Sequence, residues 1–330
     1  MTGPTTASPF PDLSSDRPSA ARATLVATMR NEGPFLLEWV AYHRIIGFTE
    51  VVICTNDCVD GSPELLDALQ NHGLLNHLRC SPTADDQPQL FAYAAAERHL
   101  RHDWPDVLMV LDADEFLNIH VGFGTVSDLL EAVPRATSIL LNWRIFGNSG
   151  HKRWLPELVI RRFVQAASQD HGVNRSFKTL FTSPRAYHCP LLPHGPGFAK
   201  EDAVSQLIAV DGAGAVLDDR YTRMETFLQT DPGLVRWDLG QINHYNTRSW
   251  EDYVSKHDRG GGLGGERWNR DENWAAFNRN EEEDISIQRH LPSVVAHVEG
   301  LLLIPEIRSA YERSLTLYRR HLDQLNSELT

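Results

Sequence analysis

The stretch Val107-Leu108-Met109-Val110-Leu111-Asp112-Ala113-Asp114-Glu115-Phe116 changes character at its midpoint. Five apolar residues, which predict a buried strand, are followed by three carboxylates within four positions. Two aspartates separated by one residue at a strand end can both reach a single hard cation, which in turn can bridge a diphosphate. We therefore predict that Asp112 and Asp114 bind a divalent cation, the alternative being a solvated turn after the strand.

Strands and helices alternate on the N-terminal side of this stretch. Short apolar runs predict strands at residues 24–28, 51–55, 74–79 and 107–111. The segments between them predict helices at about 34–46, 62–73 and 88–101. Three such alternations indicate an α/β fold with a mainly parallel, doubly wound (Rossmann-like) sheet that is covered on both faces. Ligands bind such sheets at the carboxyl ends of the strands, where Asp112 and Asp114 lie.

The pattern is looser after Asn118. Residues 138–143 and 158–163 predict two further strands, whereas residues 170–219, rich in Gly, Pro and His, predict loops. Apolar residues at helical spacing over 291–324 predict two helices separated near Pro305. Residues 1–22 have little apolar content and predict a disordered tail.

The composition of the 330 residues narrows the function classes. Hydrophobic residues make up 42% and charged residues 23%, as in folded proteins. The net charge of −13 argues against a nucleic-acid partner, which would require a basic face. No apolar stretch is long enough to span a bilayer and no signal peptide is recognisable, so we expect a cytoplasmic protein, with peripheral membrane contact left open. The four scattered cysteines are expected to be free thiols.

Polar residues also follow the first two predicted strands. They are Arg30, Asn31 and Glu32 after the first strand, and Asn56, Asp57 and Asp60 after the second. Short polar side chains at these positions can hydrogen-bond a base or a ribose, and Gly61 permits a tight turn before the next helix. Each of these residues, taken singly, is also an ordinary turn residue.

As a set, these motifs resemble the family 2-like glycosyltransferases of the GT-A fold, in particular a bacterial branch related to the family 92 enzymes. The resemblance covers roughly residues 24–290 and rests on Asn31-Glu32, Glu38-Trp39, Tyr42-His43, Gly47, Asn56-Asp57, Asp60-Gly61, Asp112 to Phe116, Phe146 to His151, Lys178, Asn243-His244-Tyr245, Ser249, Lys256 and Arg259-Gly260. It implies a GT-A domain over residues 23–250, with a nucleotide-binding half at about 23–118 and an acceptor half at about 119–250. A Gly-rich lid and a helical C-terminal segment would follow at 251–330.

The resemblance implies transfer of a sugar from a nucleotide-diphosphate sugar, with UDP favoured, to a hydroxyl of a glycan, polysaccharide or glycolipid. Asp112 and Asp114 would hold Mn²⁺ or Mg²⁺ on the diphosphate, with His244 as a further ligand. The nucleotide would lie over Arg30, Asn31, Glu32, Asn56, Asp57 and Asp60. Lys178, Lys256 and Arg259 are candidates for contacts with the departing diphosphate.

An inverting transfer requires a carboxylate that deprotonates the acceptor hydroxyl. The related families are inverting, although the residues alone do not distinguish inversion from retention. The candidates for this base are Asp284, Glu283, Asp202 and Glu115, of which Asp284 is preferred. Residues 256–265, with five glycines after Arg259, predict a lid that closes over the donor.

Two other function classes remain open from the sequence. A sugar-1-phosphate nucleotidyltransferase shares the core fold, but it would carry repeated glycines after the first strand, which residues 29–33 lack. A non-catalytic carbohydrate-binding protein could use the eight tryptophans to stack on sugars, but it has no need for three acids at the ligand edge. A zinc site at His188, Cys189 and His194 would need another ligand.

Overall fold

The computed structural model describes residues 21–225, 229–258 and 270–328. The strands of its main sheet are β1 Ala23–Met29, β2 Glu50–Thr55, β3 Asn76–Arg79, β4 Val107–Val110, β5 Glu115–Ile119, β6 Ser138–Ile145, β8 Phe177–Thr182, β9 Ala209–Val210 and β10 Gly240–His244. Two further strands, β7 Gln165–Ala166 and β11 Glu282–Glu283, pair with each other. The α-helices are α1 Gly33–Ile45, α2 Ser62–Asn71, α3 Pro88–Leu100, α4 Val126–Ala132, α5 Val159–Arg162, α6 Asp219–Thr222, α7 Trp250–Asp258, α8 Arg270–Phe277, α9 Leu291–Leu302 and α10 Pro305–Glu328.

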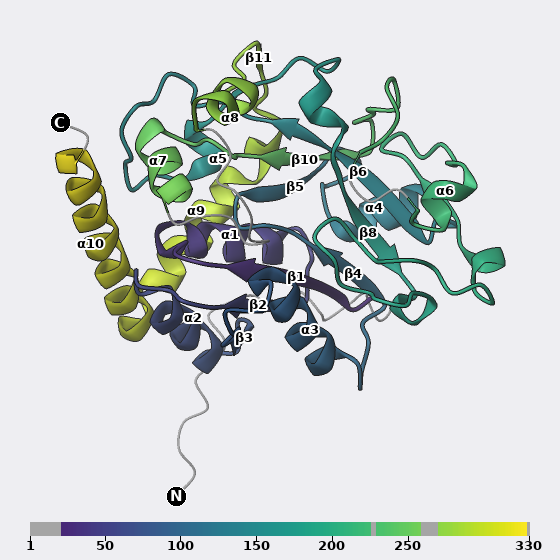
Figure 1. Ribbon diagram of the computed structural model, residues 1–330, viewed down its shortest axis with the longest axis horizontal. Coiled ribbons are helices and arrows are strands. Elements are labelled where there is room, and N and C mark those ends of the chain that lie inside the picture. Colours follow the sequence, from purple (N-terminus) through teal and green to yellow (C-terminus); the bar gives the residue numbers. More distant parts are fainter. Residues whose placement is uncertain (1–20, 226–228, 259–269, 329–330) are drawn as a thin grey trace, which may run out of the picture.

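The main sheet has the strand order β3-β2-β1-β4-β8-β6-β10-β5 (Figure 1). Strand β9 pairs with β6. Five of the strand pairs in the main sheet are parallel and three are antiparallel. The predicted α/β fold with a mainly parallel sheet is therefore confirmed. The antiparallel pairs all involve β5 or β8, neither of which the sequence pattern predicted.

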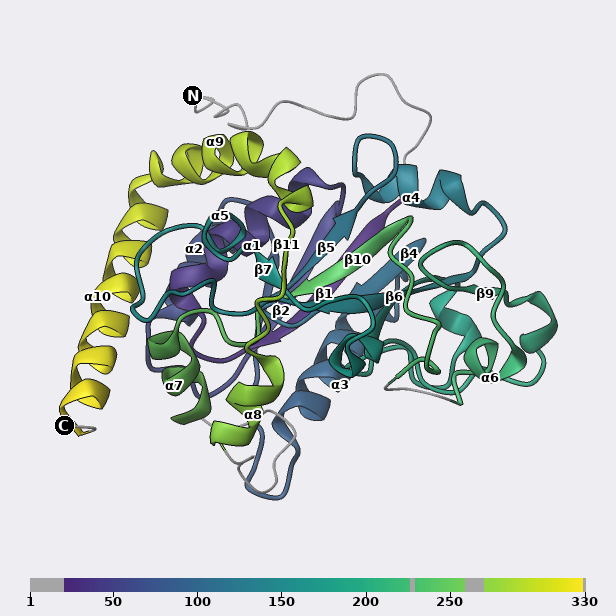
Figure 2. The same ribbon diagram turned by 90° about the horizontal axis from the view of Figure 1, so that it is seen from above.

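The first four strands alternate with helices as predicted. Leu25 and Ala27 of β1 pack in the core that contains residues of α1 and α2, whereas Val26 packs in a second core with α3. The chain therefore moves from one face of the sheet to the other between β3 and β4 (Figure 2). This change creates a topological switch point between β1 and β4, where doubly wound sheets bind their ligands.

The prediction of loops over residues 170–219 is wrong at residues 177–182, which form strand β8. This strand lies between β4 and β6 and is antiparallel to both. Its residues Phe177, Leu180 and Phe181 are buried, but Lys178 and Thr179 are buried as well. Because polar residues here lie inside the protein, the segment lacks the alternation of apolar and polar residues that marks a half-exposed strand.

The predicted strand at residues 158–163 is instead the short helix α5. The carboxylate of Glu38 in α1 accepts hydrogen bonds from the backbone N–H groups of Val159 (2.6 Å) and Ile160 (2.9 Å). These groups belong to the first turn of α5, where no intrahelical acceptor is available. Glu38 lies far away in the sequence, so a local pattern could not reveal this cap. Burial raises the pKa of Glu38 to about 7, although the two hydrogen bonds oppose the shift.

The C-terminal segment forms the two predicted helices, α9 and α10. Helix α9 packs on α1, and α10 packs on α2 and α7 (Figure 2). The buried residues Ile307, Tyr318 and Leu322 give α10 an apolar stripe, which covers this side of the core. Within the described residues, no helix combines the length and the apolar character needed to cross a membrane.

Both predicted halves, residues 23–118 and 119–250, contribute strands to the one main sheet. The boundary between them, like the separate unit at 251–330, stays a prediction. Most of the predicted tail and of the predicted lid, including Arg259, lies outside the described residues.

Candidate functional site

Asp112 and Asp114 lie in the turn after β4, and Glu115 is the first residue of β5, beside the switch point. We call residues 112–115 the carboxylate turn. Strand β8 positions a cation against them, because its antiparallel register with β4 pairs Met109 with Leu180 and brings Lys178 to the end of β4. The Lys178 Nζ atom lies 2.8 Å from Asp112 Oδ2 and 2.9 Å from Glu115 Oε2. The turn thus combines three acidic side chains with a buried ammonium group.

Lys178 is fixed in this position. Its side chain is fully buried, and Nζ also donates to the carbonyl oxygen of Pro193 at 2.6 Å. Burial lowers the pKa of Lys178, but Asp112 and Glu115 outweigh burial and raise it above the ordinary value. An ammonium group has three N–H donors, and in this structure those of Lys178 match these three acceptors. Its charge offsets one of the three carboxylate charges of the turn.

Glu115 closes the turn from inside. Its Oε2 atom accepts the backbone N–H of Asp112 at 2.8 Å in addition to the bond from Lys178. Burial raises the pKa of Glu115, and the charge of Lys178 opposes this shift. Among the four predicted base candidates, Glu115 is the one that lies in the carboxylate turn. Its Oε2 atom, however, already accepts hydrogen bonds from Lys178 and from the backbone N–H of Asp112.

Strand β10 brings His244 to the second aspartate. Its antiparallel register pairs His244 with Glu115, and the backbone N–H of Tyr245 donates to the Asp114 carbonyl at 2.8 Å. The His244 Nε2 atom consequently lies 3.5 Å from Asp114 Oδ2. Lys256, in the last turn of α7, donates a hydrogen bond to the same oxygen. Burial raises the pKa of Asp114, but Lys256 and His244 outweigh it and hold the pKa well below its usual value.

Arg248 is a site residue that the sequence motifs did not include. Its buried guanidinium donates to Glu32 Oε2 (3.0 Å) and to the carbonyl oxygen of Ala113 (3.1 Å), and it lies 3.7 Å from the ring centre of Phe35. Arg248 therefore fastens the loop after β1 to the carboxylate turn. A signal was available, because Arg248 lies between the quoted residues His244 and Ser249. The carboxylate of Glu32, predicted to contact a nucleoside, pairs with Arg248 in this structure.

Asp60 and Asn31 join the loops that follow β1 and β2. The Asp60 carboxylate accepts the backbone N–H groups of Gly33 (2.8 Å) and Ser62 (3.0 Å), which begin α1 and α2. Asn31 Oδ1 accepts the backbone N–H of Val59 at 2.8 Å. The structure thus places both residues where they shape the edge of the site.

The other nucleotide-binding candidates also lie at this edge. Arg30 and Asp57 are exposed and Asn56 is half-buried. The Asn56 Nδ2 group donates to Asp57 Oδ2 at 2.9 Å. These three side chains follow β1 and β2 and remain accessible to a ligand at the carboxyl ends of the strands.

An aromatic and imidazole cluster borders the turn on the side of β6. The ring of Trp143 lies 4.3 Å from that of His244 and 5.7 Å from that of His194. His194 Nδ1 lies 2.8 Å from the carbonyl oxygen of Phe177, an acceptor, so this nitrogen carries the proton. Burial, together with the charge of Lys178, lowers the pKa of His194 to about 4. His194 is therefore neutral at physiological pH, and it borders the carboxylate turn instead of forming the zinc site considered with His188 and Cys189.

Asp284, the preferred base candidate, lies on the opposite face of β6 and β10. Its Oδ2 atom accepts from Gln241 Nε2 at 2.8 Å and lies 3.2 Å from Arg144 Nη1, and Oδ1 accepts the backbone N–H of Ser286 at 2.9 Å. Successive residues of a strand point to opposite faces, so Arg144 and Gln241 face away from the side chain of His244. The structure does not bring Asp284 to the carboxylate turn.

Two further base candidates are exposed. Glu283 lies on β11, which pairs with β7, and Asp202 lies in the loop before β9. Neither belongs to the carboxylate turn at the end of β4.

A divalent cation can be tested against this geometry. Within the described residues, no group of three or more His, Cys, Asp or Glu side chains is arranged to hold a metal. Asp114 Oδ2 and His244 Nε2, at 3.5 Å, are nevertheless close to the spacing of about 3 Å expected for neighbouring ligands of an octahedral ion. Mg²⁺ is commonly bound by one or two carboxylates together with substrate phosphates, so the residues present fit a cation that shares its coordination with a diphosphate.

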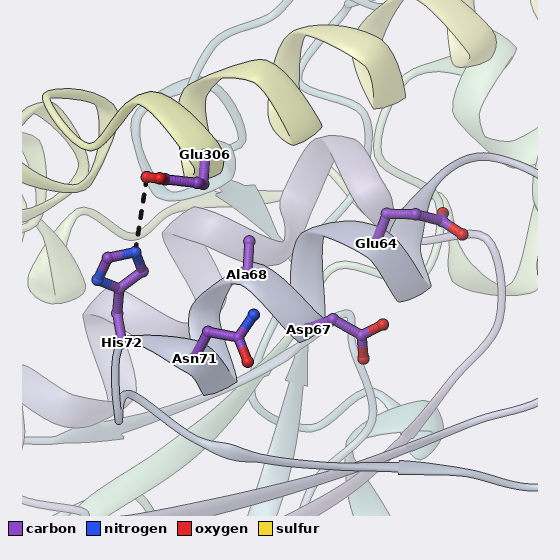
Figure 3. Close-up of a pocket in the computed structure, with 6 residues that line it drawn as sticks. All are labelled: Glu64, Asp67, Ala68, Asn71, His72 and Glu306. Carbon is purple, nitrogen blue, oxygen red and sulfur yellow. Dashed lines mark ion pairs between the residues drawn. The ribbon is translucent and has the colours of Figure 1, made fainter.

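A pocket elsewhere on the surface does not belong to this site. It is a hollow of about 510 Å³ between α2 and the start of α10, lined by Glu64, Asp67, Ala68, Asn71, His72 and Glu306 (Figure 3). One ion pair crosses it, with His72 Nε2 lying 3.8 Å from Glu306 Oε2. The pocket shares no residue with the carboxylate turn, and its three acidic side chains disfavour a phosphate.

Comparison with curated proteins identifies two relatives of the same family. A glycosyltransferase family 92 protein of Oryza sativa subsp. japonica is 29% identical over 149 residues, which cover 44% of this chain and 25% of that protein. Another family 92 protein, from Ricinus communis, is 23% identical over 251 residues, which cover 75% of this chain and 39% of that protein. The chain thus spans between a quarter and two fifths of these relatives' lengths. No protein-family model matches the chain.

One similar solved structure is the mannosyltransferase PcManGT from Pyrobaculum calidifontis in complex with GDP-Man and Mn²⁺. It is 13% identical, the match covers 95% of this chain and 90% of that chain, and the TM-score is 0.36. Residues 1–349 of S. aureus TarS, in complex with UDP, are 13% identical. The match covers 93% of this chain and 92% of that chain, and the TM-score is 0.35. The chain is thus similar to the family 92 glycosyltransferases, as its motifs predicted.

Proposed function

We propose that this protein is a glycosyltransferase that moves a sugar from a nucleotide-diphosphate sugar to a hydroxyl group of an acceptor. The observation that carries this proposal is the carboxylate turn Asp112–Glu115 beside the switch point between β1 and β4. Its second aspartate lies next to His244, and two lysines contact the turn. The similarity to family 92 proteins supports the same class of reaction.

The charges of the turn support a cation as cofactor. Three carboxylates face the two ammonium groups of Lys178 and Lys256, which leaves one negative charge uncompensated. A diphosphate entering this site would be repelled unless further positive charge came with it. We propose Mn²⁺ or Mg²⁺, held by Asp114 and His244 with Asp112 adjacent. When bound, such an ion would stabilise the negative charge that develops on the departing diphosphate.

The chain's own residues would bind and orient the donor. The nucleoside would lie at the ends of β1 and β2, where Arg30, Asn56 and Asp57 are accessible. Arg248 would keep the loop after β1 at a fixed position relative to Asp112 and Asp114. Preference for UDP, an inverting mechanism and a glycan or glycolipid acceptor follow from the family resemblance and are part of the proposal.

A donor panel tests this function. Purified protein is incubated with UDP- and GDP-sugars, with Mn²⁺, Mg²⁺ or EDTA, and release of nucleoside diphosphate is measured. We expect release from at least one donor, loss of release with EDTA, and loss in Asp112→Asn and Asp114→Asn. Release of pyrophosphate from a sugar-1-phosphate and a nucleoside triphosphate would instead identify a nucleotidyltransferase and contradict the proposal. Binding of sugars without any turnover would also contradict it.

A further inference from the structure

We propose that Lys256 is an internal counter-cation that couples cation binding to diphosphate binding. In the donor-free protein, Lys256 neutralises Asp114. When a divalent cation binds to Asp114, the Lys256 ammonium group leaves this carboxylate. The diphosphate of the donor then becomes the partner of Lys256. This inference rests on the proposed function, since it assumes that a cation and a diphosphate meet at the carboxylate turn.

The two lysines of the site differ in their freedom to move. Lys178 is fully buried and holds three acceptors, so its displacement would leave Asp112 and Glu115 without a cation. The side chain of Lys256 is 34% exposed, and its second contact, the carbonyl oxygen of Asn246, lies at 3.5 Å. Lys256 also lies in the last turn of α7, where its long side chain can reach solvent. Only Lys256, of these two cations, can exchange its partner without unfolding the site.

Lys256 contacts the oxygen that a cation would need. Both Lys256 Nζ and His244 Nε2 lie against Asp114 Oδ2. An ion coordinated by Asp114 and His244 would therefore lie within a few ångströms of the ammonium group. Two positive charges at such a distance repel strongly where water is scarce, and the side chain of Asp114 is only 7% exposed. Lys256 consequently competes with the ion for Asp114.

This competition couples two ligands. Without a diphosphate, the displaced ammonium group of Lys256 loses its ion pair and gains only water. With a diphosphate present, the same group finds phosphate oxygens, which are strong acceptors for it. Cation affinity should therefore be higher when a diphosphate is bound, and thermodynamic linkage requires diphosphate affinity to be raised by the cation to the same extent.

The experiment measures Mn²⁺ binding without nucleotide, from the electron paramagnetic resonance signal of the free ion. Lys256→Met removes the charge and keeps much of the side chain. Lys200→Met is a matched control, because the Lys200 ammonium group donates to the carbonyl oxygen of Arg185, which lies outside the carboxylate turn. We expect Mn²⁺ affinity to rise about tenfold or more in Lys256→Met, to stay unchanged in Lys200→Met, and to be lost when Asp114→Asn is added to Lys256→Met.

A second measurement follows UDP and GDP binding by calorimetry with and without Mn²⁺. Mn²⁺ should strengthen nucleotide binding more in the wild type than in Lys256→Met. Equal Mn²⁺ affinity in the wild type and Lys256→Met would overturn the inference, as would equal coupling in both proteins. If donor turnover depends on Mn²⁺ but Lys256→Met binds Mn²⁺ like the wild type, this inference fails alone. If Lys256→Met binds Mn²⁺ more tightly but the wild type turns over no donor, the proposed function fails instead.

Discussion

The two faces of β6 and β10 carry similar charges in different environments. On one face, Asp114 meets His244 and Lys256, and neighbouring Asp112 keeps 34% of its side chain exposed. On the other face, Asp284 meets Arg144 and Gln241, and its side chain is 6% exposed. Both faces therefore pair a carboxylate with a cation beside the same two strands.

The two faces differ in which charged groups remain accessible. We call the face with Asp114 and His244 the open face and the face with Asp284 and Arg144 the closed face. Both oxygens of Asp284 accept hydrogen bonds, which fasten the segment containing Ser286 to the sheet. On the opposite face, the half-exposed Lys256 leaves the cluster open to exchange with solvent. Carboxylate chemistry alone therefore does not distinguish a binding site from a structural network. The exposure of the cationic partner does, because the side chain of Lys256 is 34% exposed and that of Arg144 is 14% exposed.

The largest expected effect comes from the fixed cation of the open face. Lys178→Met leaves Asp112 and Glu115 without their ammonium partner, so we expect the free energy of unfolding to fall by about 3–5 kcal/mol. Urea denaturation measures this loss. Lys200→Met, which removes a lysine elsewhere, should change stability by less than about 0.5 kcal/mol. A Lys178→Met protein as stable as the wild type would mean that Lys178 is not needed to hold the turn.

Glu38 extends the comparison to a buried carboxylate that is paired with backbone N–H groups instead of a cation. Its pKa is raised to about 7, so the folded protein binds this proton more tightly than the unfolded chain does. Stability should therefore fall as pH rises from about 4.5 to 7, by up to about 3 kcal/mol, and change little from this group above pH 7. Urea denaturation across this range, with Glu38→Gln as reference, measures the effect. An identical pH slope in Glu38→Gln would exclude Glu38 as its source.

Asp114→Asn tests the open face through catalysis. The amide keeps the size of the side chain but loses the charge that faces His244 and Lys256. We expect donor turnover to fall at least about a hundredfold, which corresponds to about 2.7 kcal/mol of transition-state free energy. The circular dichroism spectrum should be unchanged. Turnover close to that of the wild type would remove Asp114 from the proposed site.

Asp284→Asn makes the matching change on the closed face. We expect a loss of about 2 kcal/mol in stability at pH 7, because Arg144 loses the more buried of its two carboxylate partners and keeps only Glu282. Turnover should stay within about twofold of the wild type. The opposite result, a large loss of turnover at normal stability, would restore Asp284 as the catalytic base that the sequence favoured.

The pH dependence of the closed face gives the smallest effect. Burial raises the pKa of Asp284, but Ser286 and Arg144 outweigh it and lower the pKa below 3.8. The stabilisation is therefore complete above about pH 4–5 and is lost as pH falls through the lower, folded-state pKa. The stability difference between the wild type and Asp284→Asn should shrink at pH 3, and acid denaturation curves of both proteins measure it. A constant difference across this range would contradict the shift.

The sequence by itself determined the parallel half of the sheet and its helices. Strands β1, β2 and β4 are apolar runs that are buried on both faces, and helices α1 to α3 each have Pro in the first turn, so local signals were sufficient there. The position of Asp112 and Asp114 at the end of β4 followed from the same pattern. Lys178, Lys256 and His244 were selected by resemblance, and the structure brings all three to that turn.

Only the tertiary structure decided the roles of these residues. Strand β8 was hidden because its polar residues are buried, and α5 depends on a cap from Glu38, which is distant in the sequence. The face on which Asp284 lies is set by the register of β10 with its neighbours, and the buried bonds of Arg248 join loops that are far apart in the chain. Long-range register and burial fix which charges meet, and neither leaves a periodic pattern in the local sequence.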